Sequence, residues 1–384
     1  MRERLIIPLP SDWHGGFLSA AAQGAGLGAH FPTEADADAI RQGLSLVNND
    51  ACFTAVVAVA QAHRAVQAQA GAGIPGESAD VCVPMLCPGC RCKDIPFFVE
   101  RGLREAGLPG ITLHDFNELL RGASSAEQRC LAHALMAGDL LLQLRLRMRP
   151  HLEGPQVPYF DALSESWRGR VLEMLRSGEP FDARSFMRNL DDEAARLLPT
   201  ARLSKPRVGV AGTAAALFCP SVNGGLLQVL EEEGCEVVAP YLSGLVSYAL
   251  HAQGAEGTFL EEVDGLCACA SEGLRVIPHA VTYERARSAG LRFVPELLTH
   301  GLGWSFAGWM SILIDEGVTD IVYASVFGCL SGHVVGRGVL RRLRRYGSGA
   351  NIATVEFDPG TSSVNQVNRI KLMAAVARQG RERG

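Results

Sequence analysis

Short apolar runs in this chain end in glycine- or cysteine-containing turns, and each turn leads into a segment with helical spacing. In the first half, the strand-like run Val81–Met85 reaches the turn Cys87-Pro-Gly-Cys90, and a helix-like segment begins at about Ile95. The same order recurs after Arg207–Gly212 and Asp320–Tyr323. Strands that alternate with helices form mostly parallel sheets covered on both faces. We therefore expect an α/β protein, with functional groups beyond the carboxyl ends of the strands.

The middle of the chain has a different character. From residue 125 to about 200, Leu and Arg recur at helical spacing and several prolines interrupt the run. This pattern predicts a helical segment, residues 125–204, between an N-terminal α/β domain, residues 1–124, and a C-terminal one, residues 205–384. Further strands are expected at residues 5–7, 236–239 and 351–357, and helices at residues 14–26, 33–45 and 51–68.

Composition and charge exclude several classes of protein. Of the 384 residues, 47% are hydrophobic and 20% charged, which is a globular balance, and the net charge of −5 predicts neither nucleic acid nor a membrane as a partner. No apolar run approaches the roughly 18 residues of a membrane span. The apolar run near the N-terminus is too short for a signal peptide. We therefore expect a cytoplasmic protein.

The chain contains 11 cysteines, a high number for its size. Cytoplasmic thiols are kept reduced, so metal binding or catalysis becomes the expected use of these side chains. Three of them share one context: Cys90 and Cys329 each follow a glycine in a strand-to-helix turn, and Cys52 lies just before a predicted helix. Amides at helix N-termini favour thiolates and an anionic cluster. The three are predicted iron–sulfur ligands, although single cysteines are often small buried hydrophobes.

A second group of cysteines lies around the first turn. The spacing Cys82-x4-Cys87-x2-Cys90 matches that of plant-type ferredoxins, and Cys87-x2-Cys90 fits half of a zinc site. Cys82, however, belongs to a hydrophobic strand and is expected to face the core, which disfavours a local ferredoxin loop. Cys87 and Cys92 remain candidate extra ligands. Ordinary core or helix positions are expected for Cys130, Cys235, Cys267 and Cys269.

Five motifs resemble those of the activase-related proteins of the 2-hydroxyacyl-CoA dehydratase system. Residues 48–53 (Asn-Asn-Asp-Ala-Cys-Phe) resemble the motif NNDACYP, and residues 89–91 resemble the end of GGGCR. Residues 326–336 resemble FGCLPNHVVGKG, residues 358–370 resemble DPGASEVNQLNRI, and residues 301–304 resemble GEGW. The similarity runs through nearly the whole chain in the same order and is weakest in the helical middle.

The resemblance implies Rossmann-like parallel sheets and an oxygen-sensitive [4Fe–4S] cluster held by Cys52, Cys90 and Cys329, with one iron left open. It implies as partner an ATP-dependent activator of the actin-like fold, which delivers a low-potential electron. The implied reaction is a radical dehydration, or a related reduction, of a bound acyl-CoA or other small molecule. The chain would then be a dehydratase-like lyase or a reductase component, and relatives suggest a homodimer.

The sequence also departs from these motifs. Phe53-Thr54 replaces a Tyr-Pro pair, Leu302 replaces an acidic residue, and Cys219-Pro220 stands where a His-Pro pair is expected. Acid–base roles of the lost residues are not carried over, and Cys219 joins Cys87 as a candidate fourth ligand. Two alternatives follow. The chain is a fully ligated electron-transfer or scaffold subunit, or it is a diverged α/β binding protein without a cluster.

Two further features lie beyond Cys329. His333, four residues on, is a candidate catalytic group that would donate a proton or hydrogen bond to substrate; the alternative is a helix-capping or core histidine. A basic run follows, which would dock an acidic activator or CoA phosphates, or would simply be a solvated helix face: Arg337, Arg341, Arg342, Arg344 and Arg345. Neither GxGxxG nor GxxxxGK[ST] occurs, so no ATP site is expected in this chain.

Overall fold

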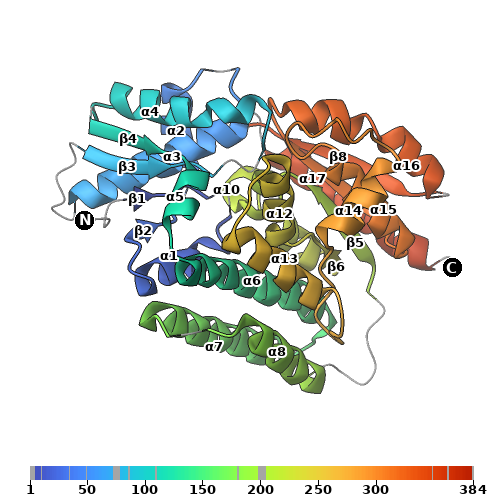
Figure 1. The fold of residues 1–384 in the computed structure, drawn as a ribbon. Coiled ribbons are helices and arrows are strands. Elements are labelled where there is room, and N and C mark those ends of the chain that lie inside the picture. The colour runs from blue at the N-terminus through green and yellow to red at the C-terminus, as the bar shows by residue number, and fades with distance from the viewer. Residues whose placement is uncertain are drawn as a thin grey trace.

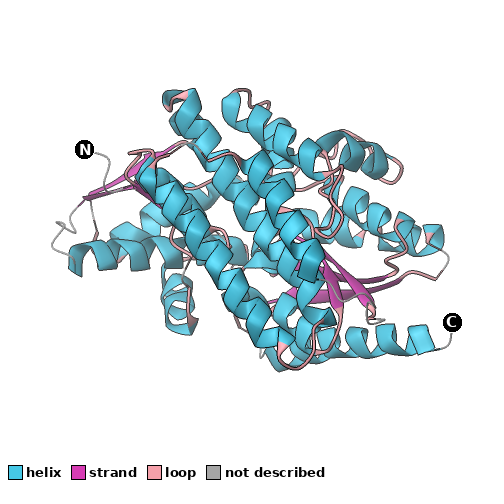
Figure 2. Ribbon diagram, turned by 90° about the horizontal axis from the view of Figure 1, so that it is seen from below, coloured by secondary structure: helices cyan, strands magenta, loops and turns pink. Residues whose placement is uncertain are grey.

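The computed structural model describes residues 5–9, 11–33, 35–48, 50–71, 78–84, 87–108, 110–179, 181–197, 205–347, 349–360 and 363–382. It has two α/β domains, each with one four-stranded sheet, and a group of long helices beneath them (Figure 1). The strands form two separate groups surrounded by helices (Figure 2). Both sheets are entirely parallel, so the predicted α/β class is confirmed.

The N-terminal sheet has the strand order β2-β1-β3-β4. The strand expected at residues 81–85 lies earlier, at residues 78–82, and Met85 falls outside the described residues. Pro84, which has no N–H for a sheet, follows its end. β2 and β4 were not anticipated. The elements are β1 (Leu5–Ile6), α1 (Gly15–Gly24), β2 (Ala29–His30), α2 (Ala37–Leu46), α3 (Phe53–Gly71), β3 (Ser78–Cys82), η1 (Arg91–Asp94), α4 (Ile95–Glu105), β4 (Gly110–His114) and α5 (Phe116–Gly122).

The helix expected at residues 33–45 begins later than predicted. Asp36 is its N-cap, because the Asp36 carboxylate accepts a hydrogen bond of 2.8 Å from the backbone N–H of Ala39. Asp competes well for this position, since its oxygen satisfies an N–H that the helix leaves unpaired. Thr33 therefore precedes the helix rather than capping it.

The helical segment consists of α6 (Ser125–Met148), η2 (Arg149–His151), α7 (Gln156–Ser177) and α8 (Ala183–Leu197). Ser124 and Glu127 start α6 with reciprocal hydrogen bonds between side chain and backbone. Beyond its first turns α6 is buried nearly all round, because it packs against α1 of the first domain and against elements of the second. Pro150 and Pro155 fall at helix boundaries, as expected. Residues 198–204, at the predicted end of the segment, lie outside the described residues.

The C-terminal sheet repeats the order of the first, β6-β5-β7-β8. Its elements are β5 (Arg207–Gly212), α9 (Ala214–Phe218), α10 (Pro220–Asn223), α11 (Leu226–Glu232), β6 (Glu236–Val238), α12 (Leu242–Ala252), α13 (Thr258–Ala270), α14 (Tyr283–Leu291), α15 (Ser305–Asp315), β7 (Asp320–Val326), η3 (Gly332–Arg337, a π-helix), α16 (Leu340–Tyr346), β8 (Asn351–Phe357) and α17 (Ser363–Glu382). In each sheet the chain winds to one side and then to the other, so a switch point lies between β1 and β3, and another between β5 and β7.

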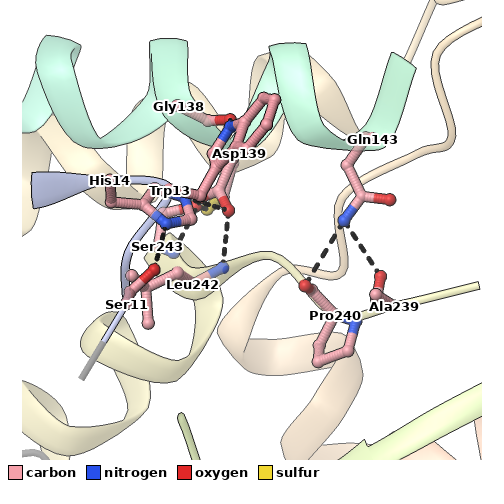
Figure 3. Close-up of polar contacts among 11 residues, drawn as sticks. Ser11, Trp13, His14, Gly138, Asp139, Gln143, Ala239, Pro240, Leu242 and Ser243 are labelled. Carbon is pink, nitrogen blue, oxygen red and sulfur yellow. Dashed lines mark hydrogen bonds and ion pairs between the residues drawn. The ribbon is translucent and has the colours of Figure 1, made fainter. Parts of the chain in front are cut away.

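α6 also joins the two domains through buried polar side chains (Figure 3). Asp139 accepts hydrogen bonds from the backbone N–H groups of Leu242 (2.7 Å) and Ser243 (2.8 Å) at the start of α12. His14 Nε2 lies 3.1 Å from the same carboxylate, and its Nδ1 lies 2.7 Å from the Ser11 hydroxyl. Ser11, His14 and Asp139 have no exposed surface. This Ser–His–Asp contact therefore connects the domains and offers no hydroxyl to a substrate.

No helix in the described ranges has the length and apolar character needed to cross a bilayer.

Candidate metal centre

Loops from both domains meet where β3 and β7 end. The backbone N–H of Phe53 donates to the carbonyl of Phe327 (3.0 Å), and the Arg91 guanidinium donates to the carbonyl of Gly328 (2.5 Å). A third loop joins them, since the N–H of Gly301 donates to the carbonyl of Pro88 (2.6 Å). These contacts place the start of α3, the β3–η1 turn and the β7–η3 turn against one another. Each of the three carries one of the predicted cysteines.

Cys52, Cys90 and Cys329 are all buried in this contact region. Cys90 raises the pKa of Cys52 electrostatically, and Cys52 raises the pKa of Cys329 in the same way. The three thiols therefore belong to one group, although up to 277 positions of the sequence separate them. Two more cysteines of the β3–η1 turn take part. The sulfur of Cys92 lies 3.7 Å from that of Cys52. Cys87 contributes to raising the pKa of both Cys92 and Cys329.

The pKa values of the thiols in this group differ in direction. The thiol of Cys92 lowers the pKa of Cys90 to about 5, against the effect of burial, and backbone N–H groups of the turn and of Ser331 contribute. It also lowers the pKa of Cys52 to about 7. In return, Cys52, Cys87 and Cys90 raise the pKa of Cys92 well above its usual value. Cys92 therefore holds its proton while Cys52 and Cys90 are poised as thiolates, which are the form that binds metal.

The sulfur of Cys329 has different surroundings from those of Cys52 and Cys90. Burial raises the pKa of Cys329 to about 12, and the electrostatic effect of the nearby Cys87 adds to this. The backbone N–H of Gly332 points at its sulfur from 3.3 Å, and the hydroxyl of Ser331 lies 3.8 Å away. An N–H aimed at sulfur stabilises a thiolate or a cluster bound to it. A metal bound at this position would supply the positive charge that favours the thiolate of Cys329.

Glycines allow the loops to approach so closely. Gly328 has φ +72°, and a Cβ on it would lie 3.0 Å from the Cα of Cys52. Gly301 has φ +62°, and a Cβ there would come within 2.2 Å of the Ser331 hydroxyl. Both positions combine a backbone conformation suited to glycine with a lack of space. The glycine before Cys329 thus serves the contact between domains as well as the turn.

The donor set is made of thiols, which select soft metals and iron–sulfur clusters. Within the described residues, no three His, Cys, Asp or Glu side chains converge closely enough to hold one metal ion. In a four-iron cluster each cysteine binds a different iron, so the sulfurs lie farther apart than the ligands of a single ion. Buried thiols with an N–H aimed at sulfur are the kind of donor set that holds an iron–sulfur cluster.

Two other cysteines have different neighbours. Cys82 ends β3, is fully buried, and has its pKa raised by burial, as expected for a core position. Cys219, the candidate fourth ligand, is fully buried at the start of α10 beside Asp12 and Ser221, and burial raises its pKa to about 12. Of the two candidate fourth ligands, the structure brings Cys87 to the three predicted cysteines.

His333 lies one turn beyond Cys329 on η3, with its N–H bonded to the Cys329 carbonyl (3.1 Å). Its ring nitrogen Nε2 lies 3.0 Å from the carboxylate of Glu356 on β8, and the Arg337 guanidinium binds the same carboxylate at 2.6 Å. The imidazole is thus directed towards Glu356. Glu356 and Arg337 both line an open groove of about 900 Å³ beside β8.

From the sequence, Cys92 was only a candidate extra ligand, and Gly301 was only the first residue of a motif, with no role of its own. The spacing Cys90-x-Cys92 was visible, but its use depends on the turn of η1, which directs the Cys92 sulfur to Cys52. The sequence feature that pointed to Gly301 was its place in the GEGW-like motif.

No protein-family model matches this chain, and a search of curated proteins finds no significant relative. The resemblance to the dehydratase system therefore stays a prediction.

Proposed function

We propose that this chain is a cytoplasmic [4Fe–4S] protein of the 2-hydroxyacyl-CoA dehydratase/activase type. It takes a low-potential electron from an ATP-dependent activator of the actin-like fold and uses it on a bound acyl-CoA or other small molecule, in a radical dehydration or related reduction. One observation carries the proposal: Cys52, Cys90 and Cys329, from three distant segments and two domains, lie in one buried thiol group.

The residues around the thiols suit this use. Cys52, Cys90 and Cys329 would hold the cluster, and the N–H of Gly332 would donate to the sulfur of Cys329. When bound, a cluster of this type supplies one-electron chemistry and, at an iron without a protein ligand, a Lewis acid. Burial of the three cysteines limits the access of water and oxygen. His333 remains the candidate proton donor, with Glu356 as the group that orients its ring.

A second function is favoured by the two extra thiols. Cys87 lies near enough to Cys329 to raise its pKa, so it is the candidate fourth ligand. Four thiolates would leave no iron open to substrate, and the chain would then be an electron-transfer or scaffold subunit. Both functions require the same three cysteines and differ at Cys87. A homodimer is compatible with either.

The test is anaerobic purification followed by iron and acid-labile sulfide analysis. We expect about four irons and four sulfides per chain, the composition of a [4Fe–4S] cluster, and a loss of most of both in Cys52→Ala, Cys90→Ala and Cys329→Ala. The matched control is Cys235→Ala, which removes a buried thiol outside the group and should keep the iron.

The outcomes separate the alternatives. Cys87→Ala that retains four irons but gains a [3Fe–4S] electron paramagnetic resonance signal on mild oxidation would identify Cys87 as the fourth ligand. A wild-type cluster that already gives this signal readily would indicate an open iron. An iron-free protein that folds equally well without the three cysteines would overturn both functions and leave a binding protein without a cluster.

A further inference from the structure

Two thiols of the candidate metal centre lie in contact with each other. The sulfur of Cys92 is 3.7 Å from that of Cys52, which stands 40 positions earlier in the sequence. Cys52 directly precedes α3, and Cys92 lies on η1, which leads into α4. The helices α3 and α4 pack against each other (Figure 1), so their packing keeps the two sulfurs together.

The contact is close to the geometry of a disulfide. An S–S bond is about 2.0 Å long, so the two sulfurs would have to approach by roughly 1.7 Å. Cys92 belongs to a 3₁₀-helix of four residues whose N-terminus no side chain caps. Hydrogen bonds in such short helices are poorer than those of an α-helix. Rotation of the two side chains, with a small shift of η1, can therefore supply the approach.

A small oxidant can reach this pair of thiols. Cys52 is buried, whereas Cys92 is partly exposed. Cys92 and Cys87 line a cavity of about 40 Å³ between the segments that follow β1 and β3, which contribute Pro8 and Pro84. One water molecule needs roughly 10–15 Å³ of such a volume, so a molecule of two heavy atoms, such as hydrogen peroxide, fits.

Gln61 of α3 gives the same cavity a buried acceptor. Its Nε2 donates to the carbonyls of Leu9 and Thr33, at 3.0 Å each, which fixes the orientation of the amide. Gln61 lines the cavity, and its buried Oε1 has no hydrogen-bond partner among the described residues. A buried acceptor without a partner is costly. The O–H of a small molecule in the cavity would satisfy it.

We propose that the cluster-free chain forms a Cys52–Cys92 disulfide with hydrogen peroxide, and that this bond blocks cluster loading until it is reduced. One sulfur attacks an oxygen of the peroxide and becomes a sulfenic acid, with release of water. The other thiol displaces the hydroxyl group as a second water. Two thiols thus lose two electrons and two protons, and the peroxide becomes two waters.

The two parts of the proposal have different foundations. Formation of the disulfide follows from the sulfur contact and the cavity, whatever the chain does. Blocked loading rests on the proposed function, because Cys52 is one of the three predicted cluster ligands and a disulfide would remove it from that set. Disulfides of cytoplasmic proteins are usually transient and redox-sensing, which suits a bond that a thiol reductant reverses.

Peptide mapping of the cluster-free full chain identifies the bond. The chain is reduced, freed of reductant under nitrogen and treated with a stoichiometric amount of hydrogen peroxide, and the remaining thiols are blocked with N-ethylmaleimide. Trypsin cleaves after Arg91 and so separates Cys92 from Cys90. Cys52 lies in a third peptide. We expect the peptides of Cys52 and Cys92 to be linked, and dithiothreitol to remove the link.

Variants test which thiols take part. The link should be absent from Cys52→Ala and Cys92→Ala. It should be present in the matched control Cys235→Ala, which removes a buried thiol outside this contact. Oxidised chain without the link, or with its new bond inside the peptide that holds Cys87 and Cys90, overturns the proposal.

A second measurement tests the block on loading. Oxidised chain is incubated anaerobically with iron and sulfide, the iron-loaded and iron-free chains are separated, and each fraction is mapped. We expect the link only in the iron-free fraction, and dithiothreitol should restore loading to the level of chain that was never oxidised. Loaded chains that keep the link overturn the block. Reduced chain that binds no iron overturns the proposed function instead, while the peptide map still decides whether the disulfide forms.

Discussion

At the scale of single residues, Cys92 decides the state of its neighbours. Its thiol contacts the sulfur of Cys52 at 3.7 Å and lowers the pKa of both Cys52 and Cys90. A thiol that keeps its proton can donate to a thiolate, and this donation favours the charged form. Cys92 therefore prepares two predicted ligands for metal without being one of the three predicted cysteines.

This arrangement predicts how cluster-free protein reacts with iodoacetamide. Because the pKa of Cys90 is lowered to about 5, Cys90 is a thiolate above that pH. Its sulfur is buried, so iodoacetamide should alkylate it at pH 6.5 when local opening of the turn exposes it. In Cys92→Ala the donor is lost, the pKa of Cys90 rises towards its ordinary value, and alkylation at pH 6.5 should slow about tenfold. Mass spectrometry of Cys90 peptides across pH measures both. Cys235→Ala is the control, and a pH profile of Cys90 that Cys92→Ala leaves in place would contradict the assignment.

At the scale of elements, α6 acts as the connection between the two sheets. Its Asp139 carboxylate caps α12 by accepting the N–H groups of Leu242 and Ser243, and it binds His14 of the first domain. Gln143, one turn along, donates to the carbonyls of Ala239 and Pro240. These contacts satisfy buried backbone groups that would otherwise be left unpaired.

Asp139→Ala should therefore be strongly destabilising. It leaves two buried N–H groups and the His14 ring without their acceptor, and each unsatisfied group costs about 1–3 kcal/mol. We expect a loss of about 2 kcal/mol or more in the free energy of unfolding, measured by urea denaturation of the cluster-free protein. Asp38→Ala, at an exposed helical aspartate, is the control and should change stability by less than about 0.5 kcal/mol. Equal midpoints for the two variants would contradict a connecting role for Asp139.

At the scale of the whole molecule, the candidate metal centre lies between the domains. Cys52 and Cys90 belong to the first domain and Cys329 to the second, and the Arg91–Gly328 and Phe53–Phe327 hydrogen bonds cross the same boundary. A cluster bound there would link the two sheets covalently through its ligands.

Loading should consequently stabilise both domains together. A group that binds only the folded state adds about 2.7 kcal/mol at a hundredfold excess over its dissociation constant. We expect anaerobic reconstitution with iron and sulfide to raise the midpoint of thermal unfolding by about 5 °C or more, and a chelator to reverse the gain. Circular dichroism measures it. Cys329→Ala should show no gain and Cys235→Ala the full gain. Stabilisation that persists in Cys329→Ala would mean that the cluster does not bridge the domains.

The sequence by itself determined the fold class and most of the elements. Apolar runs and turn residues act over a few positions, so β5, β6, β7 and β8 were found within a few residues. β2, with two residues, is too short to show a pattern, and β4 was also missed. The turn context of Cys52, Cys90 and Cys329 was likewise local, which is why the three could be singled out together.

Only the tertiary structure decided which side chains meet. The contact of Cys92 with Cys52, the place of Cys219 beside Asp12, and the pairing of His333 with Glu356 join positions that no local pattern relates. The basic run at residues 337–345 was visible in the sequence, but the pairing of Arg337 with Glu356 at an open groove beside β8 was not. Periodicity specifies which face of an element is buried. The partner of that face depends on how helices and sheets pack, and packing is a property of the whole chain.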